Sequence, residues 1–324
     1  MESINGILPL YKPVGPTSHD MVSWLRKKLN IKRIGHSGTL DPFAQGVLVM
    51  GIGKGTRILE YLKDAYKVYT MTFRLGLMTD TYDIEGKVIS NEEVYLNESD
   101  IVDAVMSMQG FQKQVPPLYS AKKYQGKKLY EYARKGKIIK MPPRDVEIQS
   151  IEILKLLGRD ITLQATVSAG TYMRSLAFDI GMKLGTTACA VDLIRNSNGR
   201  FEAEMCLRME ENPEYDLDKL SKYMISLSDA LSEFPVVKVD NCFEEKVLNG
   251  NPVRLDWVLE KGDFKKEQLL RIVNEQNELI ALGYAQRNAS FFETLKHQAR
   301  DEIVIRIKKV FGTGSFGENK TDVE

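Results

Sequence analysis

The segment from Arg33 to Val49 carries the residues best suited to chemistry in this chain. Its polar side chains, interrupted by glycines and a proline, predict an irregular loop, because such a run is poor core material. It holds one carboxylate, Asp41, which stands directly before Pro42 and a run of apolar residues. A lone carboxylate in a loop can be catalytic. An Asp before Pro is also a common turn former, so the residue type alone leaves both interpretations open.

Two further segments have the same polar, turn-rich character, namely Lys12–Ser18 and Gly170–Leu176. In the second segment, Tyr172 and Arg174 fall at the expected start of a helix. The helix dipole and a cation would both favour an anion there. A helix capped by Thr171 with a surface arginine explains the same residues, and spacing does not decide between the two interpretations.

The common cofactor and catalytic signatures are missing from the sequence. Residues 51–57 contain Gly-Lys near Thr but lack the spacing of a Walker A loop, and the chain has no G-x-S-x-G or H-E-x-x-H motif. The three histidines and three cysteines are too scattered for a metal site or a disulfide scaffold: His19, His36, His297, Cys189, Cys206 and Cys242. We therefore expect no metal and no nucleotide cofactor.

The composition is that of a folded globular protein. The 324 residues include 45 Lys and Arg against 44 Asp and Glu, a formal net charge of +1, which excludes a globally basic nucleic-acid-binding protein and an acidic tail protein. The N-terminus does not read as a secretory leader, and no stretch approaches the ~20 apolar residues of a membrane span. We expect no membrane association and, with so few cysteines, a cytoplasmic location.

The near-zero total hides two segments of opposite charge. Residues 111–144 hold ten basic residues and one acid, a net charge of +9, together with five aromatic residues. Residues 201–240 hold four basic residues and ten acids, a net charge of −6. Cations interleaved with rings suit single-stranded or looped RNA, whereas a solvated amphipathic helix explains the first segment equally well.

Hydrophobic periodicity indicates the elements that must position these residues. Residues 66–76 alternate at period two and predict a half-buried strand. Further strands are expected at 4–10, 47–52, 87–89, 148–156, 161–167 and 191–194, and helices at about 18–29, 58–63, 98–108 and 172–184. Hairpins rather than regular βαβ units favour an α+β fold, with a mixed, largely antiparallel sheet flanked by helices. The last ~75 residues predict a small β-barrel-like domain with one helix near 243–248.

Several motifs together resemble one family. Residues 35–42, Gly-His-Ser-Gly-Thr-Leu-Asp-Pro, closely resemble the catalytic motif of TruB-type tRNA pseudouridine synthases. Further blocks in family order are residues 12–18, 67–69, 76–86, 114–121 and 170–176. Residues 248–253 and 279–283 more weakly resemble a PUA RNA-binding domain. The resemblance implies the pseudouridine synthase fold for 1–232 and a PUA-like domain for 233–311. The final segment, 312–324, is rich in glycine and charged residues, and we expect it to be disordered.

The resemblance also implies roles for individual residues. Asp41 would be the catalytic acid, Tyr69 would stack on the flipped uracil, and Arg174 would pair with Asp41. Because Arg174 is a nearby opposite charge, we expect it to lower the pKa of Asp41. The resemblance also implies a set of substrate-binding residues, namely His36, Lys12, Tyr172, Leu193, Lys122, Lys123, Lys127 and Lys128. The four lysines from Lys122 onward belong to a segment, 114–136, that is a mobile thumb in the family.

The function implied is the isomerisation of uridine 55 in the T-loop of tRNA, by base flipping and by cleavage and re-formation of the glycosidic bond. No cofactor is needed, the partner is the T-stem-loop of tRNA, and we expect a monomer. Two alternatives remain open. A guide-RNA-dependent synthase of the dyskerin type shares the Asp loop and the PUA domain. The protein could instead act mainly as a tRNA-folding chaperone.

Overall fold

A computed structural model describes residues 4–117, 119, 123–129, 132, 137, 139, 141–209, 220–297 and 302–312. The chain forms two compact units, one from Leu8 to Met224 and one from Ile225 onward that includes the N-terminal segment ending at Ile7. Two backbone hydrogen bonds join Ile7 and Ile225, with N···O distances of 2.9 and 2.8 Å. They explain why the first strand begins in the smaller unit.

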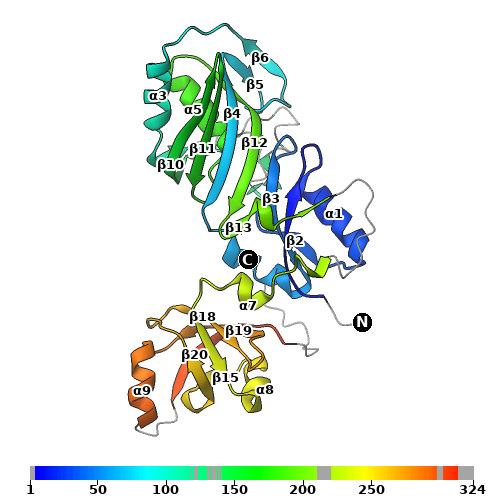
Figure 1. Ribbon diagram of the computed structural model, residues 1–324, viewed down its shortest axis with the longest axis vertical. Coiled ribbons are helices and arrows are strands. Elements are labelled where there is room, and N and C mark those ends of the chain that lie inside the picture. Colours follow the sequence, from blue (N-terminus) through cyan, green and yellow to red (C-terminus); the bar gives the residue numbers. More distant parts are fainter. Residues whose placement is uncertain are drawn as a thin grey trace. The chain divides into compact units, whose positions relative to one another are not determined.

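The larger unit is built on a 10-stranded sheet with the order β14-β1-β3-β12-β4-β11-β10-β7, with β13 beside β12 and β2 beside β3 (Figure 1). The strands are β1 Gly6–Lys12, β2 Ile34–His36, β3 Gln45–Ile52, β4 Lys67–Leu75, β7 Gly110–Gln114, β10 Arg144–Leu157, β11 Asp160–Val167, β12 Ala188–Asn198, β13 Phe201–Glu202 and β14 Leu207–Arg208. β1–β14 and β3–β12 pair in parallel, whereas the pairs that join β12, β4, β11, β10 and β7 are antiparallel. The predicted fold class is confirmed.

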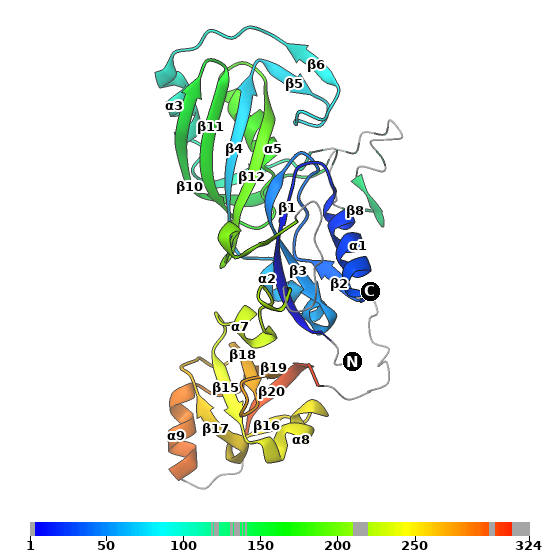
Figure 2. The same ribbon diagram turned by 45° about the vertical axis from the view of Figure 1, so that its right-hand side comes forward.

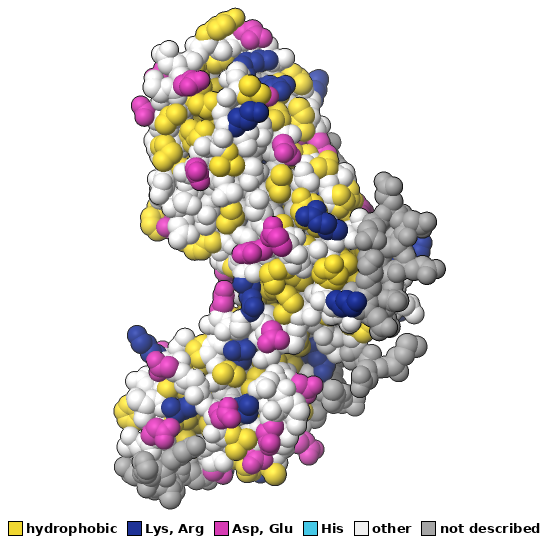
Figure 3. Space-filling view, in the orientation of Figure 1, with side chains coloured by type: hydrophobic (Ala, Val, Ile, Leu, Met, Phe, Trp, Pro, Cys, Tyr) yellow, Lys and Arg dark blue, Asp and Glu magenta, His cyan; other side chains and the backbone are white. Residues whose placement is uncertain are grey.

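The central strands show the alternation that the sequence predicts. Tyr69, Met71 and Phe73 of β4 are buried, and the residues between them turn to the other face of the sheet. The buried face packs against helices α3 (Glu98–Met106) and α5 (Met173–Lys183). The open face is polar, with Arg74 paired to Asp160 at 2.7 Å. Figure 3 shows acidic, basic and apolar side chains interspersed over the face in view.

The segment that precedes the Asp41 loop is ordered by helix α1 (Ser18–Leu29). Thr17 caps α1 through the backbone N–H of Asp20, whose carboxylate accepts the Thr17 N–H in return. Figure 2 shows α1 and β2 beside β1 and β3. The turn η1 (Gly53–Arg57) and the short helix α2 (Leu59–Leu62) lead from β3 to β4. After β4, the strands β5 (Leu77–Thr79) and β6 (Val88–Asn91) form a hairpin.

The smaller unit contains a six-stranded, barrel-like sheet with the order β16-β20-β19-β18-β15-β17. Its elements are β15 Val236–Val239, β16 Val253–Arg254, β17 Val258–Lys261, β18 Leu269–Val273, β19 Leu279–Ala285, β20 Ile303–Val310, α7 Leu227–Ala230, α8 Glu244–Leu248 and α9 Ala289–His297. The expectation of a single helix was wrong, because α9 also forms and buries Phe292 edge-on against Phe264.

Two predicted features fall partly outside the described residues. Lys122 and nine other residues of the thumb at 114–136 lie there, as does the tail from residue 313 onward. Lys123, Lys127 and Lys128 belong to the hairpin of β8 (Lys123–Tyr124) and β9 (Lys127–Lys128), but their side chains are outside the description. No helix among the described residues has the length and apolar character needed to cross a bilayer.

Candidate active site

A cavity of about 1110 Å³ opens in the larger unit. Six of the predicted site residues line it, although they come from loops and strands far apart in the chain: His36, Asp41, Tyr69, Tyr172, Arg174 and Leu193. Asp41 lies in the loop between β2 and β3, whereas Arg174 begins helix α5. The fold therefore brings together the candidate carboxylate and the candidate cation.

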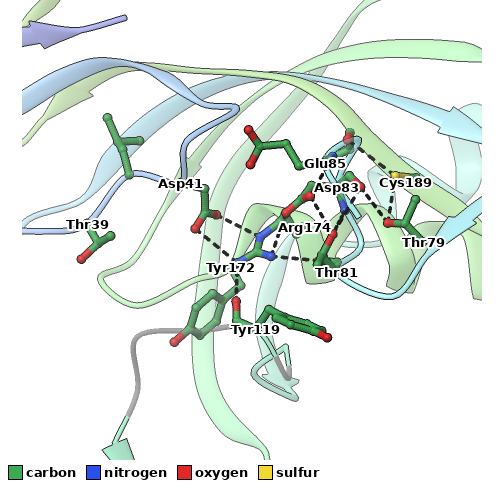
Figure 4. A network of polar contacts seen from close by, with 12 residues as sticks. Thr39, Asp41, Thr79, Thr81, Asp83, Glu85, Tyr119, Tyr172, Arg174 and Cys189 are labelled. Carbon is green, nitrogen blue, oxygen red and sulfur yellow. Dashed lines mark hydrogen bonds and ion pairs between the residues drawn. The ribbon is translucent and has the colours of Figure 1, made fainter. Parts of the chain in front are cut away.

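Asp41 and Arg174 form an ion pair at the cavity (Figure 4). Arg174 Nε lies 2.9 Å from Asp41 Oδ2, and Arg174 Nη2 donates to Asp41 Oδ1 at 3.3 Å. The arginine side chain is only 4% exposed, whereas that of Asp41 is 35% exposed. The carboxylate is thus fixed by its partner and still accessible from the cavity.

A second carboxylate, Asp83, holds the same arginine from behind (Figure 4). Arg174 Nη1 donates to Asp83 Oδ2 at 2.9 Å, and the Asp83 side chain is 6% exposed. The Thr81 hydroxyl and the Glu85 backbone N–H donate to Asp83 Oδ1 at 2.6 and 3.1 Å. Sequence reasoning missed Asp83, because an Asp in an Asp-Ile-Glu-Gly run reads as an ordinary turn residue.

The remaining donors of Arg174 are also occupied. Nη1 donates to the Thr81 carbonyl and Nη2 to the Tyr119 carbonyl, both at 2.9 Å. With two carboxylates and two carbonyls around it, this guanidinium is held rigidly. Arg174 is therefore suited to orient Asp41.

The pKa of Asp41 depends on its burial as well as on Arg174. Burial raises the pKa of the Asp41 carboxyl, and the Arg174 guanidinium opposes this increase without cancelling it. The Asp83 carboxylate raises this pKa further, whereas the Lys12 ammonium lowers it. Arg174 lowers this pKa as predicted, but burial outweighs the effect of Arg174. The extent of burial could not be read from the sequence.

Lys12 supports the loop from outside the cavity. Its side chain is fully buried, and Nζ donates to the carbonyls of Pro13 and Pro42 at 2.8 and 3.2 Å. Burial lowers the pKa of Lys12 to about 8, with Asp41 acting in the opposite direction. Lys12 does not line the cavity, and its contacts brace the turn beside Asp41, while its assignment to substrate binding stays a prediction.

Arg195 is a further buried cation, and nothing in the sequence singled it out. It is 1% exposed, and its guanidinium donates to the Val47 carbonyl at 2.6 Å and the Gly38 carbonyl at 3.2 Å. Longer contacts of 3.4 Å reach the Thr39 carbonyl and the Tyr69 hydroxyl. Arg195 thus joins the loop before Asp41 to the ring of Tyr69. Its partners are mostly backbone carbonyls, which leave no signal in the sequence.

Replacing Arg195 with methionine is expected to lower the free energy of unfolding by about 3 kcal/mol, because several buried carbonyls lose their donors. Thermal or urea unfolding measures the loss. Arg74→Gln is the matched control, since Arg74 lies on the open face of the sheet in a partly exposed pair and should cost about 1 kcal/mol or less. Equal losses in the two variants would contradict a clamping role for Arg195.

The other cavity residues are positioned by the sheet and by α5. Tyr69 is 8% exposed and faces Arg195 across the β4–β12 pair, and Leu193 of β12 is 5% exposed. Tyr172 precedes α5, and its backbone is bound by the Gln114 side chain at both N–H and carbonyl. His36 ends β2, which pairs with β3. An aromatic ring and apolar side chains therefore border the carboxylate, as a site for a planar base requires.

The fold and the sequence both match known proteins. Residues 26–173 match the model of the TruB family pseudouridylate synthase N-terminal domain. A solved structure described as a Cbf5-Nop10-Gar1 complex contains a chain 27% identical to this one, with a TM-score of 0.71, covering 94% of this chain and 84% of that one. The architecture is therefore that of the pseudouridine synthases.

Curated relatives define the family more narrowly. A tRNA pseudouridine synthase B of Thermotoga petrophila is 47% identical over 310 residues, covering 95% of this chain and 99% of the relative. One from Clostridium novyi is 41% identical, covering 86% and 95%. The chain belongs to the TruB family of pseudouridine synthases.

Proposed function

We propose that this protein, a tRNA pseudouridine synthase by its family, converts uridine 55 in the T-loop of tRNA to pseudouridine. The observation that carries the proposal is a carboxylate, Asp41, fixed by Arg174 at the wall of the cavity. The full-length similarity to tRNA pseudouridine synthases B supports tRNA as the substrate. The cytoplasm is the proposed place of action.

The reaction requires little more than a well-placed carboxylate. The N1–C1′ glycosidic bond breaks, the uracil rotates and a C5–C1′ bond forms. The C5 proton leaves to solvent, and N1 takes up a proton in its place. Atoms and electrons balance without an oxidant or reductant. In our proposal ionised Asp41 starts the cleavage, Arg174 keeps it oriented, and the cavity retains the detached uracil.

Base flipping gives the neighbouring residues their proposed roles. The target base leaves its stack at a cost of a few kcal/mol, which stacking on Tyr69 and contact with Leu193 offset. His36 would take the space that the base vacates, and Tyr172 would border the same pocket. The burial of Tyr69 and Leu193 at the cavity wall supports these assignments.

RNA binding would extend beyond the cavity. We assign phosphate contacts to the thumb lysines Lys122, Lys123, Lys127 and Lys128, and an RNA-binding role to the PUA-like C-terminal unit of a monomeric enzyme. Changing these four lysines to alanine should weaken tRNA binding and flatten its dependence on salt, because fewer counterions are released. An unchanged slope of affinity against salt would indicate that these lysines are solvated and do not contact the RNA.

The pH dependence follows from the raised pKa of Asp41. Because the carboxylate must be ionised, the value of kcat/KM should fall as the pH drops through the pKa of Asp41, and this acid limb should lie above the usual range of an aspartate. Tritium release at a series of pH values, with T-loop RNA labelled at uracil C5, measures the profile. An acid limb at or below the ordinary value would show that Arg174 fully offsets the effect of burial.

A guide-RNA-dependent synthase is the second candidate. The observation in its favour is the similarity to a chain solved in a Cbf5-Nop10-Gar1 complex, although its 27% identity is far below the 47% shared with the Thermotoga enzyme. A bare T-loop hairpin separates the two, since turnover without guide RNA or partner proteins supports the stand-alone enzyme. A tRNA-folding activity can coexist with catalysis, and tRNA refolding by wild type and Asp41→Asn tests it.

A further inference from the structure

Among the described residues, three arginines line the cavity, and contacts within the protein occupy the hydrogen-bond donors of two of them. Arg174 is held by two carboxylates and two carbonyls, and Arg195 by carbonyls and the Tyr69 hydroxyl. Arg144 is different, because no described residue forms a hydrogen bond or an ion pair with its side chain. A guanidinium has five N–H donors. At this wall of the cavity those donors are available to a ligand.

The protein nevertheless fixes the place of this guanidinium. Its carbon lies 5.2 Å from the centroid of the Tyr172 ring, at cation–π distance. Gly170 also lies against the guanidinium, with a φ of +86°, and a Cβ there would stand 1.4 Å from Arg144 Nη2. Only glycine leaves room for the guanidinium at this point.

The backbone around Arg144 is equally well defined. Arg144 begins β10, opposite Gln114 at the end of β7. The buried Gln114 amide accepts from the Tyr172 N–H at 2.7 Å and donates to the Tyr172 carbonyl at 3.1 Å. Strand pairing and this amide therefore set the ring and the guanidinium relative to each other, two residues from Arg174.

We propose that Arg144 binds a backbone phosphate of the RNA strand that carries the target uridine, an inference that rests on the proposed function. A planar guanidinium matches two phosphate oxygens with parallel hydrogen bonds. Stacking on Tyr172 orients the plane of the guanidinium and leaves the N–H groups at its edges able to bind a ligand. Arg174 cannot take this role, because its donors already serve Asp41 and Asp83.

Equilibrium binding of a T-loop hairpin RNA tests the proposal, measured over a range of KCl concentrations in the Asp41→Asn background, where no turnover intervenes. Arg144→Gln should raise Kd about tenfold. It should also reduce the slope of log Kd against log salt by about 0.7 to 0.9, the value for one phosphate. Arg144→Lys keeps the charge, so it should retain the slope with weaker binding.

Arg74→Gln is the matched control, since it removes one charge from the open face of the sheet and should leave the slope unchanged. Hairpins with a single neutral methylphosphonate linkage then locate the contact. One linkage near the target uridine should weaken binding to the Arg144-containing protein and have no further effect on Arg144→Gln.

An unchanged slope in Arg144→Gln overturns the proposal, and weaker binding with that unchanged slope would assign Arg144 to stacking on a base. Thermal unfolding of each variant shows whether a loss of binding reflects a loss of structure. The outcome is separate from that of the proposed function. If the wild-type enzyme releases tritium and Arg144→Gln leaves the slope of log Kd against log salt unchanged, only the phosphate contact fails. If the wild-type enzyme releases no tritium, the proposed function itself fails.

Discussion

Asp41→Asn is expected to lower turnover of T-loop RNA by about 10⁴-fold or more, because the amide cannot act as an anion in cleavage of the glycosidic bond. The amide has nearly the same volume, and the side chain is partly exposed to the cavity, so the fold should persist. Binding of tRNA should stay within a few fold of wild type. Single-turnover kinetics and equilibrium binding measure the two quantities.

Asp160→Asn is the matched control for this variant. Asp160 is paired with Arg74 on the open face of the sheet, outside the cavity. Its replacement makes the same chemical change and should leave turnover near wild type. Comparable turnover by Asp41→Asn and the control would remove Asp41 from catalysis, and a large loss of tRNA affinity in Asp41→Asn would show that its role is in binding.

The second large effect is expected at the Arg174 ion pairs. Arg174→Met leaves the buried Asp83 carboxylate without a cation, which should cost about 3–5 kcal/mol of the free energy of unfolding. It also releases Asp41, so turnover should fall steeply. The double variant Arg174→Met with Asp83→Leu replaces the buried pair by apolar groups and should recover much of the stability.

Activity and stability are expected to separate in that double variant. Because Asp41 still lacks its orienting partner, turnover should remain as low as in Arg174→Met although the protein is again stable. Urea unfolding and tritium release, measured on the same preparations, make the comparison. Recovery of activity along with stability would show that Arg174 supports only the fold.

The sequence was most informative where the signal was local. The alternation in residues 66–76 predicted β4, and hydrophobic periodicity predicted the helix α1 at about 18–29, because both depend on neighbours in the chain. The loop around Asp41 could be singled out by composition. Its pairing with Arg174, 133 residues away, came from the family resemblance, since spacing carries no information about such a contact.

The missed features depend on tertiary structure. Asp83 becomes a buried counter-ion only because its turn reaches Arg174, and Arg195 binds mainly carbonyls, which every residue has. The pKa of Asp41 depends on burial more than on Arg174, and burial is a property of the fold. Lys12 donates to the carbonyl of Pro42, a contact that its residue type does not indicate. The residue types were thus visible in the sequence, whereas burial and long-range partners were not.

The most direct test of the proposed function is tritium release from T-loop hairpin RNA labelled at uracil C5, with purified protein and no guide RNA or cofactor added. Each conversion of uridine to pseudouridine exchanges one C5 hydrogen with solvent. The proposal predicts that release from the wild type approaches one tritium per target uridine and that Asp41→Asn releases none. No release by the folded wild-type protein would contradict it.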